Sequence, residues 1–193
     1  MKKVCVFMDN GSEEVEALTI VDFLRRTGMQ CDLVSNTNSL ELVGSHKIKI
    51  IADKKLSDIE NDFSYDALVI PGGIPGAYNL RDNEKLLTFI KAMSERGKKT
   101  AAICAGPVVL DAAGILAGKK ATSYPKFNEQ FKTQVNYQEE LVVVDGNVIT
   151  SRGPATAILL ALILVKELLG NEACEKLKEQ LLFPLLKNDI ENY

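Results

Sequence analysis

The segment KKTAAICAGPVVLDAAG, residues 98–114, places Cys104 between a run rich in alanine and β-branched residues and a helical stretch that begins at Pro107. The first run is typical of a short strand buried on both faces. A strand that turns at once into a helix is the repeating unit of parallel α/β sheets. The thiol has two interpretations. Either it fills a turn as a small buried side chain, or a tight turn exposes it as a nucleophile.

The rest of the chain continues this alternation of strands and helices. Apolar runs predict buried strands at residues 3–8, 30–35, 65–70 and 99–103. Helical spacing predicts helices at residues 13–27, 84–96, 107–113, 154–169 and 172–182. Right-handed crossovers then give a mainly parallel sheet with helices on both faces. We expect one domain over residues 1–193, a length that buries a substantial core.

Two antiparallel hairpins are also expected. Residues 40–43 and 47–52 form a strand pair around Gly44, and LVVVDGNVIT at residues 141–150 has Asp145-Gly146 between two β-branched runs. An Asp-Gly step suits a tight hairpin turn. The apolar helix at residues 155–165 is expected to be core or a partner contact.

Composition excludes several classes of partner. The net charge is −3, and Lys and Arg are scattered, so neither nucleic acid nor a membrane surface is expected as a partner. The apolar stretches at residues 4–8 and 155–165 are too short for a signal peptide or a membrane span, so we expect a cytoplasmic protein. The four cysteines show no metal-ligand spacing, so no metal, cofactor or disulfide is expected.

Four loops follow predicted strands and carry the residues that chemistry needs. They are DNGSEEVE at residues 9–16, PGGIPG at 71–76, CAGP at 104–107 and SRGP at 151–154. Ligands of such sheets bind at the carboxyl ends of the strands. The sequence therefore predicts a site where these four loops meet.

Acidic residues open the first predicted helix. Glu13 and Glu14 are explained by the helix dipole, which favours negative charge at this end. Glu16 lies on the side of Ala17 and Ile20, which makes it a candidate partner for the thiol. A shared proton would raise the pKa of its carboxyl, while its hydrogen bond would favour the thiolate.

The glycines and the arginine each have a structural and a functional interpretation. Gly72 and Gly73 shape a turn, and the amide of Gly73, with that of Ala105, would also bind an oxyanion. Arg152 would bind an anion or form a structural salt bridge. A helix N-terminus after Cys104 would favour its thiolate.

Five motifs recur in order at familiar spacings: GSEEVEA, LRRTG, YDALVIPGG, AAICAGP and TSRGPAT. Together they resemble the ThiJ/PfpI superfamily and, within it, the DJ-one-like branch of Parkinsonism-associated deglycases. The resemblance runs from residue 3 to about residue 182. It implies a flavodoxin-like three-layer α/β sandwich, usually a homodimer, with a reactive cysteine at a nucleophile elbow.

The same resemblance implies roles for individual residues. Cys104 is the reactive cysteine, and Glu16 is the protonated glutamate beside it. The amides of Gly73 and Ala105 form the oxyanion site. Arg152 lies near the site and the dimer contact.

Two positions depart from the pattern of this branch. Many members have histidine in a T-H-P segment beside the cysteine, whereas SYP here places Tyr124 there. A tyrosine hydroxyl donates a hydrogen bond but is a poor proton shuttle at neutral pH. At Gly44-Ser45-His46 the family often has an arginine that reaches the partner's site. His46 either takes that cross-subunit role or is an exposed loop residue.

The leading functional hypothesis is a glutathione-independent glyoxalase or deglycase-type enzyme acting on small 2-oxoaldehydes. Cys104 would form a hemithioacetal and Glu16 would carry the proton between adjacent carbons. The alternative is an oxidative-stress sensor or redox chaperone that uses oxidation of Cys104 with little turnover. Peptidase-like relatives carry a histidine directly after the nucleophile, where this chain has Ala105. Amidotransferase relatives need a histidine late in the chain, and none follows His46. Both functions are therefore excluded.

Overall fold

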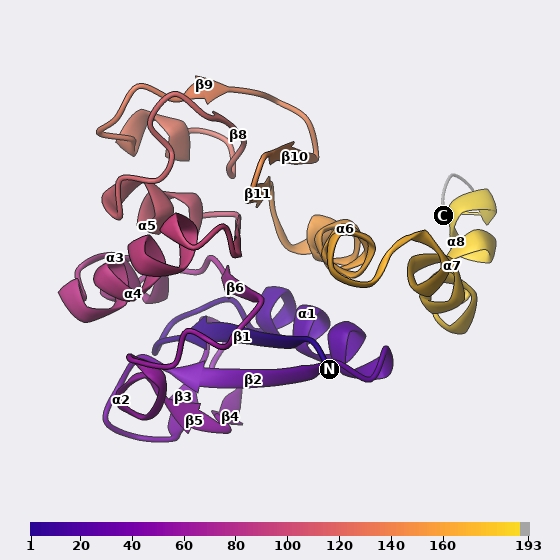
Figure 1. Cartoon of the computed structure of the whole chain (residues 1–193), viewed down its shortest axis with the longest axis horizontal. Coiled ribbons are helices and arrows are strands. Elements are labelled where there is room, and N and C mark those ends of the chain that lie inside the picture. Colours follow the sequence, from indigo (N-terminus) through magenta and orange to yellow (C-terminus); the bar gives the residue numbers. More distant parts are fainter. Residues whose placement is uncertain (190–193) are drawn as a thin grey trace.

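The computed structural model describes residues 1–189, with side chains to residue 186, and has a seven-stranded sheet at its centre (Figure 1). The strand order is β10-β11-β7-β6-β1-β2-β5. Every neighbouring pair is parallel except β10 with β11, which are antiparallel. The strands are β1 (Lys3–Met8), β2 (Gln30–Ser35), β5 (Lys54–Lys55), β6 (Ala67–Ile70), β7 (Lys99–Ile103), β10 (Val142–Asp145) and β11 (Val148–Ser151). The predicted mainly parallel sheet is confirmed.

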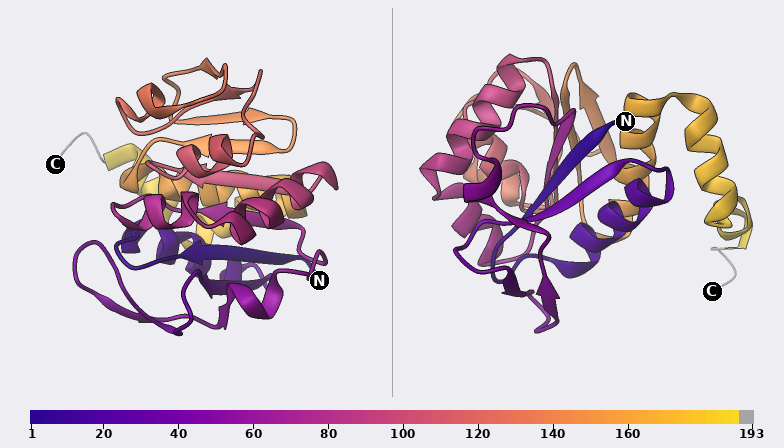
Figure 2. Two further views of the ribbon diagram at one scale, coloured as in Figure 1. Left: turned by 90° about the vertical axis from the view of Figure 1, so that its left-hand side faces the viewer. Right: turned by 60° about the horizontal axis from the view of Figure 1, so that its bottom comes forward.

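Helices cover both faces of this sheet. One face carries α1 (Glu14–Arg26) and α6 (Ala157–Leu169), and the other carries α3 (Gly76–Arg81), α4 (Glu84–Glu95) and α5 (Pro107–Ala112) (Figures 1 and 2). Alternate residues of β1 serve the two cores: Val4, Val6 and Met8 pack with α1 and α6, while Cys5 and Phe7 pack with α4 and α5. The chain is therefore a three-layer sandwich. Successive side chains of a strand point to opposite faces of the sheet, and each face is covered by its own layer of helices.

Three smaller pieces lie outside the main sheet. The predicted first hairpin is present as β3 (Glu41–Val43) and β4 (Lys49–Ile51), which pair antiparallel. A parallel pair of β8 (Lys120–Ala121) and β9 (Asn136–Tyr137) was not predicted, nor was the short helix α2 (Leu56–Ile59). Segments of two to four residues are too short to carry a periodic signal.

The apolar helix α6 is largely core. Its buried residues pack against α1 and the sheet, and α7 (Asn171–Gln180) lies outside it (Figure 2). The apolar segment LLFPLL at residues 181–186 leads into α8 (Phe183–Asp189), where Phe183 packs against the core, whereas Leu185 and Leu186 are exposed. Among the described residues, no helix combines the length and the apolar character that crossing a membrane requires.

Candidate active site

Cys104 lies at the sharp turn between β7 and α5. Its backbone is left-handed, with φ of 62°, a conformation that costs a non-glycine residue of order 1–3 kcal/mol. Hydrogen bonds hold it there: its N–H donates to the carbonyl of Ser151 at 3.0 Å, and its carbonyl accepts from the N–H of Tyr124 at 2.9 Å. This geometry is a nucleophile elbow, in which a strained turn presents one side chain at the end of a strand.

Small residues make the elbow possible. A Cβ at Gly106 would lie 2.8 Å from the carbonyl oxygen of Ile103 and 2.9 Å from that of Pro71. A Cβ at Gly72 would lie 2.6 Å from the Cβ of Cys104 and 2.9 Å from its Sγ. Only glycine fits at either position, so the loop after β6 reaches the sulfur directly.

Glu16 projects from the buried face of α1 and is 0% exposed. Its Oε2 accepts a hydrogen bond from the N–H of Gly72 at 2.7 Å. Its Oε1 is buried and has no partner of ordinary hydrogen-bond geometry among the described residues; the neighbouring group is the Cys104 thiol. Burial raises the pKa of Glu16 to about 7, against the opposing hydrogen bonds of Gly72 and Cys104. The carboxyl is therefore poised to hold a proton near neutral pH.

The thiol of Cys104 is also perturbed. Burial, followed by the charge and hydrogen bond of Glu16, raises its pKa, and the backbone N–H groups of Ala105 and Gly73 oppose that rise. This differs from the expectation that a helix N-terminus leaves a thiolate, because burial beside a carboxylate outweighs the helix. Cys104 and Glu16 thus form a coupled pair that loses its protons as a unit.

The predicted oxyanion donors converge on the sulfur. The N–H of Gly73 comes from the loop after β6, and the N–H of Ala105 comes from the first residue after the elbow; both favour the Cys104 thiolate and so lower the pKa of this thiol. Neither N–H is used in a backbone hydrogen bond of the described loops and turns. Two strand ends therefore supply donors at one point, next to the carboxyl of Glu16.

The loops that contain Tyr124 and Arg152 lie next to Cys104. The Tyr124 ring packs edge-on against Phe127, with centroids 6.2 Å apart, and lies beside Gly153. The guanidinium of Arg152 donates to the carbonyl of Glu139 at 2.6 Å. Within residues 1–186 it forms no ion pair with a carboxylate, so the structural salt bridge considered from the sequence is absent there.

His46 lies on the exposed loop between β3 and β4, with 70% of its side chain exposed. Its Nδ1 is 3.1 Å from Oε2 of Glu14 and 3.4 Å from Oε2 of Glu13. The hydrogen bond to Glu14 and the charge of Glu13 raise the pKa of His46. In the single chain, His46 therefore contacts the start of α1 and not the thiol.

Glu14 binds the loop between β3 and β4, a role that the helix dipole does not explain. It is 1% exposed, and its Oε1 accepts from the N–H of His46 at 2.8 Å and of Ile48 at 3.4 Å. Burial opposes its ionisation, but hydrogen bonds from its own N–H, His46 and Ser45 more than offset this and lower its pKa to about 2. Glu13, as expected for a helix start, caps α1 by accepting from the N–H of Val15.

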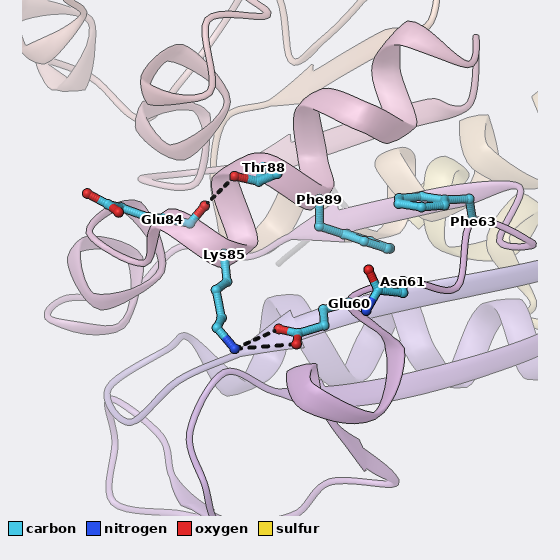
Figure 3. A pocket seen from close by; sticks show the side chains of 7 residues that line it. All are labelled: Glu60, Asn61, Phe63, Glu84, Lys85, Thr88 and Phe89. Carbon is cyan, nitrogen blue, oxygen red and sulfur yellow. Dashed lines mark hydrogen bonds and ion pairs between the residues drawn. The ribbon is translucent and has the colours of Figure 1, made fainter.

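A surface hollow between the segment after α2 and helix α4 lies apart from this group (Figure 3). Its lining contains no residue that the sequence analysis selected. The Lys85 amine pairs with the Glu60 carboxylate across it at 3.2 Å, and Phe89 lies beside Phe63. We do not assign it to the candidate active site.

A family model described as the DJ-1/PfpI family matches residues 2–167. The chain belongs to the DJ-1/PfpI family. It is 35% identical over 183 residues to the Parkinson disease protein 7 homolog of Danio rerio, covering 94% of this chain and 97% of that protein. It is 42% identical over 171 residues to Protein DJ-1 homolog B of Arabidopsis thaliana, covering 88% of this chain. The chain spans about two-fifths of the length of that plant protein, since 39% of it is matched.

Solved structures of DJ-1 proteins share the same fold. The oxidized DJ-1 of Toxoplasma gondii superposes with a TM-score of 0.89 at 40% identity, covering 94% of this chain and 98% of that one. DJ-1beta of Drosophila melanogaster superposes with a TM-score of 0.90 at 34% identity, covering 94% and 97%. The flavodoxin-like fold expected from the five motifs is confirmed for this DJ-1/PfpI family member.

Proposed function

We propose that the chain is a cysteine-dependent, glutathione-independent enzyme of the glyoxalase or deglycase type, acting on small 2-oxoaldehydes or their adducts. The observation that carries the proposal is the convergence on the Cys104 sulfur of a buried carboxyl and two amide donors from separate loops. A nucleophile, a proton carrier and oxyanion donors are the parts that redox-neutral conversion of an aldehyde and its neighbouring ketone requires.

The reaction with methylglyoxal balances without a cofactor. The sulfur of Cys104 adds to the aldehyde carbon, and the carbonyl oxygen takes a proton, which gives a hemithioacetal. The Glu16 carboxylate then removes the proton from that carbon and returns it to the adjacent one, so that a thioester of the hydroxy acid forms. Water cleaves the thioester, releases lactate and restores the thiol. No electron acceptor is consumed, because one carbon is oxidised as its neighbour is reduced.

The amides of Gly73 and Ala105 support the steps in which negative charge develops on oxygen. Ala105 is buried and Gly73 is half-buried, and in such surroundings a hydrogen bond to an oxyanion is stronger than in water. The pKa of Glu16, raised by burial to about 7, suits a group that must both accept and return a proton at neutral pH.

The test is to incubate the purified chain with methylglyoxal in the absence of glutathione and to follow lactate by proton NMR. In deuterated water, a carboxyl shielded from solvent returns part of the original proton, so the lactate should retain hydrogen at the carbon next to the carboxylate. Absence of lactate would exclude the proposed glyoxalase reaction.

A second candidate function is an oxidation sensor that uses the same sulfur. The amides of Gly73 and Ala105 would also stabilise a sulfinate at Cys104, since its oxygens accept hydrogen bonds. The Toxoplasma gondii relative is described as oxidized, which is consistent with this candidate.

Mild peroxide followed by mass spectrometry tests the sensor function. The sensor predicts a gain of two oxygens, about 32 Da, on Cys104 alone. The buried thiols of Cys5, Cys31 and Cys174 serve as internal controls. Unselective oxidation of all four would contradict the sensor function.

We also propose that residues 1–193 form one domain that acts as a homodimer in the cytoplasm. Exposed apolar side chains on α1 and the β3–β4 hairpin support an interface there: Val15, Leu18, Ile48 and Ile51 are 53%, 38%, 51% and 75% exposed.

Light scattering should give twice the mass of 21.2 kDa, and Ile51→Glu should reduce it to that of one chain. Val144→Glu, on the edge strand β10, is the matched control. A monomeric wild type would contradict this part of the proposal.

A further inference from the structure

The start of α1 and the β3–β4 loop bring together a group of side chains outside the proposed reaction. Glu13, Glu14 and His46 each present one donor atom, and these atoms lie within 4.8 Å of one another. We propose that Glu13, Glu14 and His46 form a binding site for a divalent cation, with zinc as the preferred ion.

Backbone hydrogen bonds occupy one oxygen of each carboxylate, Oε1, so the other oxygen, Oε2, is the candidate ligand atom. Oε1 of Glu14 accepts from two loop N–H groups, those of His46 and Ile48, and Oε1 of Glu13 accepts from the N–H of Val15. The remaining oxygen of each carboxylate, Oε2, faces Nδ1 of His46 at 3.4 Å for Glu13 and 3.1 Å for Glu14. Each carboxylate is thus oriented by one oxygen, and its other oxygen faces His46 and the Ser45 hydroxyl, where a cation would bind.

Among the described residues, His46 is the one cationic side chain that pairs with the two carboxylates. Both carboxylates are buried, Glu13 at 8% and Glu14 at 1% exposed, yet no Lys or Arg pairs with either one among residues 1–186. The N-terminus of α1 supplies about half a positive charge, which covers only part of two negative ones. By contrast, the buried carboxylate of Asp32 has the amine of Lys54 at 2.9 Å. An added cation would complete the group at the start of α1.

The Oε2 atoms of Glu13 and Glu14 share the same hydrogen-bond donors. The hydroxyl of Ser45 lies 3.0 Å from Oε2 of Glu13 and 3.1 Å from Oε2 of Glu14. One hydroxyl proton serves one acceptor well, so the second carboxylate oxygen depends on a proton carried by His46. A cation between them would replace that proton and neutralise both oxygens.

Zinc fits the donor set and its spacing. Imidazole with carboxylate oxygen is a usual zinc combination, whereas magnesium and calcium prefer oxygen donors alone. With bonds of about 2.0–2.1 Å, adjacent ligand atoms of a tetrahedral zinc ion are about 3.3–3.4 Å apart. The Nδ1 to Oε2 distances of 3.1 and 3.4 Å are close to that edge, so little movement of His46 is needed. Three protein ligands leave the fourth position for water.

The test uses the full chain after treatment with a chelator, titrated with zinc chloride against a chromophoric competitor. A Cys104→Ala background removes the partly exposed thiol, which is a competing zinc ligand. We expect one zinc per chain in this background, and at least about a tenfold loss of affinity in Cys104→Ala with His46→Ala. Glu41→Gln, an exposed carboxylate change on the same hairpin, is the matched control and should bind as the background does.

A direct readout avoids any dependence on a variant. His46 is the only histidine of the chain, so its ring gives a single set of nitrogen signals. Zinc should shift Nδ1 of the wild-type ring at one equivalent, and magnesium at the same concentration should not. Unchanged Nδ1 signals, equal affinity without His46, or loss of all binding with Cys104→Ala would each overturn the site.

Discussion

Oε2 of Glu16 lies 2.7 Å from the backbone nitrogen of Gly72, which fixes a carboxyl of α1 to the loop that follows β6. The N–H of the neighbouring residue of that loop, Gly73, favours the thiolate of Cys104. One loop therefore holds the proton carrier with one amide and the nucleophile with the next. The positions of carboxyl and sulfur are coupled through two consecutive peptide groups.

The first prediction concerns the reactivity of Cys104 with pH. Because burial raises the pKa of Glu16 to about 7, the coupled pair should lose its first proton near that pH. Alkylation of Cys104 by iodoacetamide, measured with a chelator present, should therefore increase through about pH 7 and then reach a plateau. Glu16→Gln should remove this step, and a profile unchanged by that substitution would contradict the coupling.

The same group should make stability depend on pH. In an unfolded chain Glu16 has its ordinary pKa of 4.5, whereas in the native chain its pKa is about 7. The native state then binds more protons, so the contribution of Glu16 to stability decreases as pH rises from 4.5 to above 7, by about 3 kcal/mol. Urea unfolding of wild type and Glu16→Gln across this range measures it. Parallel curves for the two proteins would show that Glu16 contributes no such dependence.

Glu14 should have the opposite dependence. Its pKa is lowered to about 2, so its stabilisation is present above 4.5 and is lost as pH falls toward 2. Glu14→Gln should lower the free energy of unfolding at pH 7 by about 2 kcal/mol, since hydrogen bonds to a charged group are lost. Glu41→Gln, which changes an exposed carboxylate, should leave that free energy within about 0.5 kcal/mol of wild type. Equal losses in both variants would contradict the role given to Glu14.

Gly72 should tolerate no side chain. An added Cβ would lie 2.6 Å from the Cβ of Cys104, so Gly72→Ala should lower the free energy of unfolding by about 1–3 kcal/mol and reduce alkylation of the thiol. At Gly153 the nearest atom to an added Cβ is a Tyr124 ring carbon at 3.4 Å, which makes Gly153→Ala the matched control. Similar stability of Gly72→Ala and wild type would show that the loop can move away from the elbow.

Local patterns predicted six of the seven strands of the main sheet, all except β5, and selected two candidate site residues. The strands containing Phe7 and Ile103 were predicted from short apolar runs, and Glu16 was selected because it lies on the apolar side of α1. The small neighbours after a strand made an elbow at Cys104 one of two interpretations, the other being a thiol that fills a turn. In each case the deciding information lies within a few residues of the chain.

Long-range contacts could not be predicted in this way. The Glu14 carboxyl binds a loop more than thirty positions further along the chain, and no spacing near Glu14 indicates that partner. The guanidinium of Arg152 likewise turns to the carbonyl of Glu139 in a loop without periodic structure. The raised pKa of Cys104 depends on how deeply the thiol is buried beside Glu16, which only the packed structure defines.

The most direct measurement compares methylglyoxal turnover without glutathione for wild type, Cys104→Ser and Cys174→Ser. Cys174 is a buried cysteine of α7 and is the matched control. The account predicts that Cys174→Ser retains the wild-type rate, whereas Cys104→Ser loses at least about a hundredfold because a serine hydroxyl is a far weaker nucleophile than the thiol. Lactate formed by Cys104→Ser at the wild-type rate would contradict the central claim.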